Sequence, residues 1–255
     1  MIFTKTRRDK VSPIFNSTDV GTHRASSLLE KLSPFDTWID GSLAKICEHG
    51  HRAVYRKGES IQLVGNQGTT VYLLESGVFE FVVTIANGRD QALGYLHAGA
   101  LLGLGHSYAA MTPVESYEYV ASGEAAVWQV PSAIFRDLMW ADRAMADSVL
   151  TILTTRIGNL IDAYANNCLL GAHGRVSRSL LQACRDPDFN VLWSRRMTAT
   201  FSMTQSQLAR MLGLSRQSVG TILREFAQAG LIRMGREKIE VLSEEGLQKI
   251  VTGRR

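Results

Sequence analysis

The stretch MTQSQLARMLGLSRQSVGTILREFAQAGLIRMG, residues 203–235, decides the fold of the C-terminal third of the chain. It holds two short apolar runs at helical spacing, separated by Gly213. Two helices that cross steeply need a small residue where their backbones approach, and Ala209 supplies it. The tight turn between them needs a residue that accepts a positive φ, and Gly213 supplies that. The stretch therefore predicts a helix-turn-helix, since an ordinary helical hairpin would rarely meet these constraints together.

Caps and buried positions support the same prediction. Thr204 and Ser215 stand where the N-caps of the two helices belong. In a helix-turn-helix the second helix lies in the major groove of DNA, with its N-terminal residues at the base edges. Five apolar residues are expected to face inward and hold the two helices together: Leu208, Leu212, Leu214, Val219 and Ile222.

The start of the second helix carries side chains suited to reading DNA. We expect Arg216 to make a bidentate contact with a guanine and Gln217 to pair with an adenine, while Thr221 contacts a base or a thymine methyl. A solvated helix residue is the alternative for Arg216 and Gln217. Contacts with phosphates position the helix without reading sequence. The residues assigned to the DNA contact surface chiefly through such contacts are Thr204, Ser206, Ser215, Ser218 and Arg224.

A small hairpin is predicted to follow. The segment AGLIRMGREKIEVLS, residues 229–243, has two strand-like runs around Gly235, as in the wing of a winged helix. Arg233, Arg236 and Lys238 are expected to contact the DNA backbone; the alternative is a solvated basic turn. Residues 170–255 hold 14 Lys and Arg against 7 Asp and Glu, whereas residues 1–169 hold 14 against 17. This asymmetry predicts a polyanionic partner for the C-terminal part alone.

The first half of the chain has a different pattern. Residues 26–50 predict short helices, and residues 51–131 predict many short strands with glycine-rich turns, hence a compact antiparallel barrel or roll. Asn87-Gly88 between apolar runs predicts a hairpin turn. Residues 142–167 predict one long helix, followed by a further helix within residues 168–198. The long helix carries apolar residues at the 3,4,3,4 spacing of a coiled-coil seam: Leu150, Leu153, Ile157, Leu160 and Tyr164.

The seam predicts a homodimer. Val149 and Ile152 form a second stripe that can pack on the strand domain, so one helix would touch its own domain and a twin copy. A core helix inside a monomer is the alternative.

Several classes of protein are disfavoured. No apolar run approaches the roughly 20 residues of a membrane-spanning helix, and no basic start followed by an apolar segment marks a secretory signal. The chain has no P-loop, nucleophile elbow or HExxH motif, so no catalytic residue is assigned. Cys47, Cys168 and Cys184 fit no metal-binding spacing, and no metal is expected. We expect a cytoplasmic protein whose thiols are reduced and mostly buried; a redox switch at Cys168 or Cys184 is the alternative.

With these motifs in order, residues 28–252 resemble the Crp/Fnr family of bacterial transcription regulators. The resemblance is most specific in TQSQLARMLGLSRQSVGTILREFAQAGLI and in YRKGESIQLVGNQGTTVYLLESGVFEF. It implies an α+β fold: an antiparallel β-roll of the cyclic-nucleotide-binding type (a double-stranded β-helix), a long dimerisation helix and a winged helix-turn-helix. The expected divisions are an N-terminal extension at 1–25, an effector-binding-like roll at 26–140, the dimerisation helix at 141–168 and the DNA-binding domain at 169–255.

Relatives that bind cyclic AMP place a glutamate on the ribose and an arginine on the phosphate. In GALLGLGHSYAAMTPVESYEYVA, residues 99–121, Leu104 stands in place of the glutamate and Glu115 in place of the arginine. A carboxylate facing a phosphate is repulsive, and Leu160 and Ile161 replace polar residues that would meet the adenine. We therefore expect no cyclic AMP binding. An apolar or cationic effector suits the region better than cyclic AMP does. The alternative is a constitutive regulator whose pocket is empty. The residues predicted to form the pocket are Leu102, Gly103, Leu104, Gly105, Glu115, Ser116 and Tyr117.

Other sensors of the family fit less well. The iron–sulfur branch needs an N-terminal cysteine cluster, and no cysteine precedes Cys47. Haem ligation by His97 or His106 is not expected, because both are lone histidines in turn-rich sequence. Relatives that read TGTGA-type sites carry R-E-T-V-G-R, whereas this chain has R-Q-S-V-G-T at residues 216–221. The guanine contact of Arg216 should survive this change, but the full consensus should not.

Together these features predict a dimeric transcription regulator that binds double-stranded DNA in a sequence-specific way. Its DNA sites would consist of two half-sites related by a two-fold axis. Its effector would be an unidentified small molecule other than cyclic AMP, or it would act constitutively, with RNA polymerase as a protein partner and no membrane contact. The alternative is a ligand-sensing module whose C-terminal domain mediates protein contacts instead of DNA binding. The charge of the C-terminal third and the position of Arg216 argue against that alternative.

Overall fold

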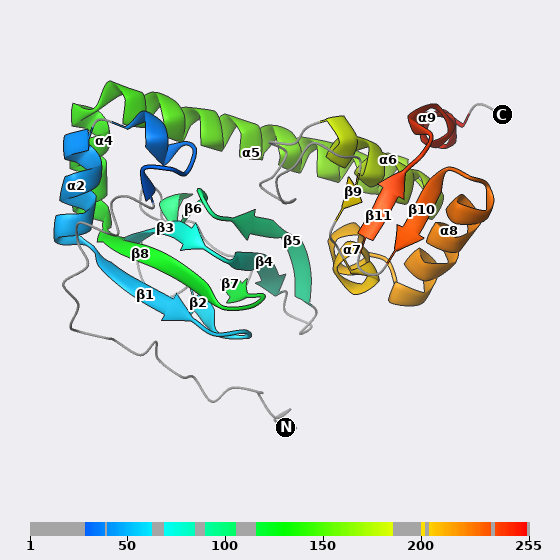
Figure 1. Cartoon of the computed structure of the whole chain (residues 1–255), viewed down its shortest axis with the longest axis horizontal. Helices are drawn as coiled ribbons and strands as arrows, with labels where there is room; N and C mark the ends of the chain where they lie inside the picture. The colour runs from blue at the N-terminus through cyan, green and yellow to red at the C-terminus, as the bar shows by residue number, and fades with distance from the viewer. Residues whose placement is uncertain are drawn as a thin grey trace.

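The computed structural model describes residues 29–38, 40–62, 69–84, 90–105, 116–185, 200–201, 204–235 and 238–253. A strand-rich N-terminal domain and a smaller C-terminal domain lie at opposite ends of the molecule, and the long helix α5 (Arg143–Leu169) runs between them (Figure 1). The predicted N-terminal extension, residues 1–25, lies outside the described residues.

The N-terminal domain is the predicted antiparallel roll, built from two four-stranded sheets. One sheet has the order β1-β8-β3-β6 and the other β2-β7-β4-β5. Thr84 of β4 pairs with Asp90 of β5, as the predicted hairpin requires, although Asn87-Gly88 itself lies outside the described residues. The strands are β1 (His51–Tyr55), β2 (Ser60–Gln62), β3 (Thr70–Ser76), β4 (Val78–Thr84), β5 (Asp90–His97), β6 (Leu101–Leu102), β7 (Ser116–Ala121) and β8 (Ala125–Pro131).

Apolar side chains fill the space between the two sheets, and one buried charge is compensated. Tyr55 and Phe79 meet edge to face there, with ring centroids 5.5 Å apart. Glu75 is buried, and its carboxylate accepts hydrogen bonds from Arg52 at 2.8 and 2.9 Å and from the Trp128 indole at 2.9 Å. A buried carboxylate is tolerated when it is paired in this way.

Helices cover the outer face of the β1-β8-β3-β6 sheet. They are η1 (Phe35–Thr37), α2 (Asp40–His49), α4 (Ser132–Ala141) and the first half of α5. Phe135 of α4, together with Met145 and Val149 of α5, packs on strand residues such as Leu73 in one buried cluster. Asp142 caps α5 by accepting a hydrogen bond from the Met145 amide at 3.1 Å. The roll and α5 therefore share a continuous core.

The C-terminal domain is a winged helix with two elements that the sequence patterns did not predict, β9 and α9. A three-stranded sheet of order β10-β11-β9 packs with the helices around Val176, Phe226 and Leu247. The elements are α6 (Ala172–Arg185), β9 (Thr200–Phe201), α7 (Gln205–Leu212), α8 (Arg216–Gln228), β10 (Ile232–Gly235), β11 (Lys238–Val241) and α9 (Glu244–Thr252). Within the described ranges, none of the helices combines the length and apolar character that a bilayer crossing requires.

The three cysteines are free thiols with different surroundings. Cys47 is buried, Cys184 is partly buried and Cys168 is exposed. The expectation of mostly buried thiols is therefore wrong for Cys168, because α5 leaves the roll before it reaches this residue. Burial, reinforced by the nearby carboxylates of Glu30 and Glu75, raises the pKa of Cys47 to about 11.

This difference predicts selective alkylation. The thiolate is the reactive form, and the rise in the pKa of Cys47 from 9.0 to about 11 reduces its thiolate fraction on the order of a hundredfold at pH 8. Iodoacetamide at that pH should modify Cys168 and spare Cys47, as read by mass spectrometry of peptides. Equal modification of both residues in the folded protein would contradict the burial of Cys47.

Candidate DNA-binding interface and effector region

The turn between α7 and α8 has the geometry that the sequence predicted. Gly213 has φ 61° and ψ 33°, the left-handed region, and its amide donates to the Ala209 carbonyl to end α7. Ala209 is buried, as expected of a residue at a helix crossing. Gly220 is a second small residue there, because a Cβ at that position would lie 3.1 Å from Oε1 of Gln205. The crossing thus depends on small residues from both helices.

The helix caps and the inward-facing residues are also confirmed. The Thr204 hydroxyl accepts from the Gln207 amide at 3.2 Å, and Oε1 of Gln207 accepts from the Thr204 amide at 2.9 Å, which makes a capping box. Ser215 caps α8 by accepting from the Ser218 amide at 3.0 Å. Four of the five residues predicted to face inward are buried: Leu208, Leu212, Val219 and Ile222. The fifth, Leu214, is partly buried against the same cluster.

The first turn of α8 presents a guanidinium to solvent. Arg216 is the first residue of the helix, and both it and Gln217 are exposed. Neither side chain makes a hydrogen bond or ion pair with a described residue, so both are available to a partner. A cation at a helix N-terminus is opposed by the helix dipole, at a cost of about 0.3–1 kcal/mol. A nearby polyanion would remove that cost.

The remaining predicted contacts on α7 and α8 surround this turn. Thr204, Ser206 and Ser218 are exposed, and the Ser218 hydroxyl lies 2.8 Å from that of Ser215. Farther along α8, the guanidinium of Arg224 donates to the hydroxyl of Thr221 at 3.2 Å. The hydroxyls of Thr204, Ser215, Ser218 and Thr221 therefore have partners inside the protein that a phosphate would have to replace.

The wing is formed by β10 and β11. Of its three basic residues, Arg233 alone has a described side chain. Arg233 lies opposite Glu240, and the two side chains form an ion pair of 2.8 Å. An exposed pair of this kind contributes about 0–1 kcal/mol, so a phosphate can compete for the arginine. Lys238 begins β11 opposite Gly235, with its backbone alone described, and Arg236 lies outside the described residues.

The predicted seam on α5 lies mostly at the surface. Leu153 is partly buried against the roll core, together with Ile152 of the second stripe. Ile161 adds to the exposed apolar surface of this helix. A helix this apolar on its outer side needs a partner to shield it. Four of the five predicted seam residues are more than half exposed: Leu150, Ile157, Leu160 and Tyr164.

The predicted effector region is filled by the protein's own side chains where it is described. Leu102, Gly103 and Leu104 are buried, and the Gly103 amide donates to the hydroxyl of the buried Tyr119 at 3.4 Å. Tyr117 is partly buried and its ring stacks on that of Phe81, with centroids 5.9 Å apart. Gly105 is exposed; only the backbone of Ser116 is described, and Glu115 lies outside the described residues.

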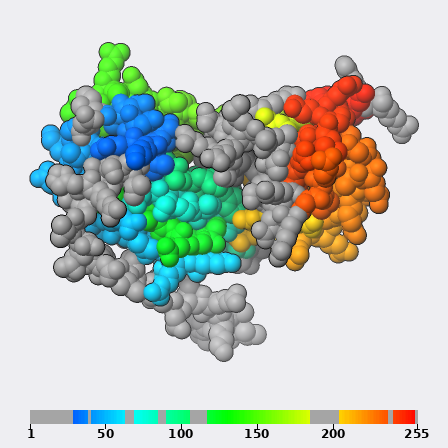
Figure 2. Space-filling view, viewed as in Figure 1, coloured from blue at the N-terminus to red at the C-terminus, as the bar shows by residue number. Residues whose placement is uncertain are grey.

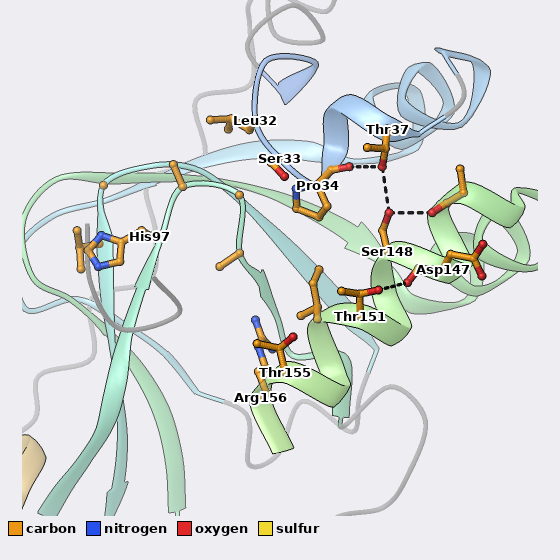
Figure 3. A pocket seen from close by; sticks show the side chains of 17 residues that line it. Leu32, Ser33, Pro34, Thr37, His97, Asp147, Ser148, Thr151, Thr155 and Arg156 are labelled. Carbon is orange, nitrogen blue, oxygen red and sulfur yellow. Dashed lines mark hydrogen bonds between the residues drawn. The ribbon is translucent and has the colours of Figure 1, made fainter. Parts of the chain in front are cut away.

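A cavity in the described structure lies elsewhere. With a volume of about 950 Å³, it is bounded by the segment around Pro34, the turn between β5 and β6, and α5 (Figure 3). It is lined by none of the seven residues predicted to bind an effector. His97 contributes to its wall, whereas His106 lies outside the described residues. The described residues include no cluster of three or more His, Cys, Asp or Glu side chains arranged to hold a metal ion.

Comparison with protein families assigns both halves of the chain. Residues 52–142 match the cyclic nucleotide-binding domain, and residues 174–250 match the Crp-like helix-turn-helix domain. The chain belongs to the Crp/Fnr family of transcription regulators. The order of roll, long helix and winged helix-turn-helix, predicted from the sequence, is thereby confirmed.

Individual Crp/Fnr relatives are distant but span most of the chain. The cyclic AMP receptor protein of Thermus thermophilus is 27% identical over 237 residues, which cover 90% of this chain and 99% of that protein. The cAMP-activated global transcriptional regulator Vfr of Pseudomonas aeruginosa is 26% identical over 194 residues, covering 75% and 89%. Similar structures include the c-di-GMP responsive regulator CLP of Xanthomonas campestris (TM-score 0.63, 17% identity, 80% and 100% covered) and FixK2 of Bradyrhizobium japonicum (TM-score 0.63, 18% identity, 79% and 96% covered).

In this Crp/Fnr chain the helix-turn-helix is docked on the roll. The side-chain amide of Gln91, in β5, donates to the backbone carbonyls of Arg210 and Met211 at 2.7 and 3.4 Å. These carbonyls belong to the last turn of α7, beside Gly213. Figure 2 shows the surfaces of the roll and the C-terminal domain side by side. The edge strand of the roll thus caps the helix that positions the recognition helix.

Charged groups reinforce this docking. The guanidinium of Arg210 lies 3.1 Å from Glu80 and 3.1 Å from Asp90, on β4 and β5. Glu80 is buried and also accepts from the Tyr95 hydroxyl at 2.8 Å. Tyr95 packs within the core cluster of the C-terminal domain, and burial raises its pKa. One arginine therefore balances a buried carboxylate across the domain boundary.

Sequence reasoning missed this contact surface. Arg210, Glu80, Asp90 and Gln91 come from segments more than a hundred residues apart. Each is an ordinary exposed-type residue within its own motif, so no spacing pattern marks it. A long-range contact of this kind becomes visible only when the two domains are placed together.

Loss of the docking contact should loosen α7. Arg210→Ala combined with Gln91→Ala leaves Glu80 buried without its counter-charge, which costs about 1–3 kcal/mol. Amide hydrogen exchange in α7 and β5 should accelerate, as measured by mass spectrometry, while exchange in α2 and β8 stays unchanged. Arg233→Ala, which breaks an ion pair inside the wing, is the control. Unchanged exchange in α7 of the double variant would show that the domains are not coupled here.

Proposed function

We propose that this Crp-like transcription regulator binds DNA as a homodimer and reads a two-fold-related operator. The observation that carries the proposal is the position of Arg216, exposed at the first turn of a helix held by the helix-turn-helix. From that position a guanidinium reaches O6 and N7 of a guanine in the major groove. Gln217 beside it supplies a second base contact, to an adenine.

A dimer through α5 supports the two-fold operator. The exposed apolar stripe of α5 would meet the same stripe of a second chain, and each chain would then present one α8. Half-sites read by such a dimer lie about one helical turn, roughly 34 Å, apart. Proteins named as transcriptional regulators among its relatives support DNA as the target. RNA polymerase is the proposed protein partner, and the cytoplasm is the proposed location because the target is DNA.

A C-terminal domain that binds another protein instead of DNA is not favoured. Residues 170–255 carry twice as many basic as acidic residues, 14 against 7. A protein-binding surface tends to be depleted of charge at its centre. Here the exposed turn begins with Arg216, and Arg224 lies two turns farther on. These features suit a phosphate backbone and base edges.

We further propose that cyclic AMP is not the effector. Eight curated relatives are all named for cyclic AMP, but in this chain Leu104 and Tyr119 are buried in the corresponding region. Leu104 offers no hydrogen bond to a ribose hydroxyl, and Glu115 would repel the phosphate. Calorimetric titration with cyclic AMP should give no saturable heat, and a dissociation constant in the micromolar range would refute this proposal.

Removal of the leading guanidinium tests the base contact. Arg216→Ala should weaken operator binding by about 1–3 kcal/mol and relax base preference at one position per half-site. The matched control is Arg233→Ala in the wing, which should weaken binding to all sequences alike and reduce the salt slope by about 1. Binding measured against every single-base operator variant separates these results. A uniform loss with Arg216→Ala would reassign that residue to a phosphate.

Charge placed in the α5 stripe tests the dimer. Ile157→Glu with Leu160→Glu would bring four carboxylates together at an apolar interface, so the protein should sediment as a monomer. Asp162→Lys, on a neighbouring exposed position of the same helix, should leave the dimer intact. A double variant that still sediments as a dimer would place the interface elsewhere.

A further inference from the structure

The outward face of α8 carries polar side chains in one row. Residues three or four positions apart share a face of a helix, so Gln217, Thr221 and Arg224 lie along one line, and all three are exposed. The buried residues of α8 occupy the opposite face. Thr221 is five residues after Arg216, which corresponds to about 7.5 Å along the helix axis. It would therefore meet a different base pair from the one that Arg216 reads.

Arg224 is anchored on its own helix at two points. Its Nε atom donates to the Gly220 carbonyl and its Nη2 atom donates to the Thr221 hydroxyl, each at 3.2 Å. The guanidinium forms no ion pair with a carboxylate of the described residues, and the neighbouring Glu225 pairs with His173 instead, at 2.7 Å. The two bonds hold a positive charge beside the Thr221 hydroxyl.

The bond from Arg224 determines which role is left to the Thr221 hydroxyl. A hydroxyl has one proton to donate and two lone pairs that accept, whereas a guanidinium can only donate. Threonines inside helices can donate that proton to the carbonyl four residues earlier, as Thr151 and Thr154 of α5 do at 2.8 and 2.9 Å. In the described part of the chain Thr221 makes no such bond, so its proton is available to a partner.

We propose that Thr221 determines base specificity by donating its hydroxyl proton to a base in the major groove, and that Arg224 is the positioning residue that fixes this polarity. This role rests on the proposed binding of DNA through α8. Acceptance of a bond from a cation strengthens a hydroxyl as a donor. A donor recognises N7 of a purine, O6 of guanine or O4 of thymine, and it has no acceptor on the exposed edge of cytosine. Arg224 thus acts through Thr221, whereas the sequence alone assigned it to a phosphate.

Base preference measured at every position of a selected operator tests the hydroxyl. Thr221→Val is nearly isosteric and removes only the hydroxyl. Discrimination at one base pair per half-site should therefore fall about two- to tenfold, the contribution of a single hydrogen bond. Thr221→Ser keeps the hydroxyl and should retain most of that discrimination. Preference at the base pair read by Arg216 should stay unchanged in both variants.

Substitution of the arginine tests the positioning role. Arg224→Met keeps the apolar stem and removes the donors, so it should lower discrimination at the same base pair as Thr221→Val does. Arg224→Lys keeps the charge but not the two-point anchor, and it should not restore that discrimination. Arg224→Met added to Thr221→Val should cause no further loss there, because the guanidinium acts through the hydroxyl. The matched control is Arg233→Met in the wing, which should weaken binding to all operators alike.

A phosphate contact by Arg224 would give a different pattern. Arg224→Met would then weaken binding to all sequences alike and reduce the salt slope by about 1, and Arg224→Lys would restore both. That pattern, or a base preference that Thr221→Val leaves unchanged, would overturn the proposal while base reading by Arg216 persists. A wild-type protein that binds no duplex from the pool would refute the proposed function itself, and this role with it.

Discussion

The helix α5 has two apolar stripes, and the chain covers one of them. Met145 and Val149 are buried against the roll, whereas Ile157, Leu160 and Tyr164 remain more than half exposed. At roughly 25 cal/mol per Å² of apolar surface, leaving this second stripe in water is unfavourable. A second copy of the same helix is the simplest complement, because an apolar stripe is self-complementary about a two-fold axis. The spacing between the two recognition helices follows from that pairing.

Docking of the helix-turn-helix on the roll links the two domains of the chain. Arg210 neutralises a buried carboxylate of the roll while it belongs to the helix that supports α8. A change at β4 or β5 must therefore alter the surroundings of that arginine. The cavity lined by Val78 and His97 lies at the other end of the same strands.

Local patterns predicted the helix-turn-helix and the roll well. The Gly213 turn, the Thr204 and Ser215 caps and the inward apolar residues depend on neighbours within a few positions, and each is found where the sequence indicated. The strand β9 was missed because two residues leave no pattern, whereas α9 was missed although Ser243, Glu244 and Gly253 supply the start and end signals of a helix. The role of Arg210 was missed because its partners, Glu80 and Asp90, are distant in sequence. The sequence patterns also did not predict that the side chain of Tyr119 occupies the interior of the predicted effector region, where its hydroxyl meets the Gly103 amide.

The most direct test of a dimer that reads DNA through α8 is selection of operators from a random pool of duplexes. Enriched sites should have two-fold symmetry, with half-site centres separated by about 10–10.5 base pairs or a multiple of it, and two chains should bind each duplex. Affinity for the selected site should fall linearly with the logarithm of the salt concentration. Enrichment of a single asymmetric half-site bound by one chain, or no enrichment at all, would show that the chain does not read DNA as a dimer through α8.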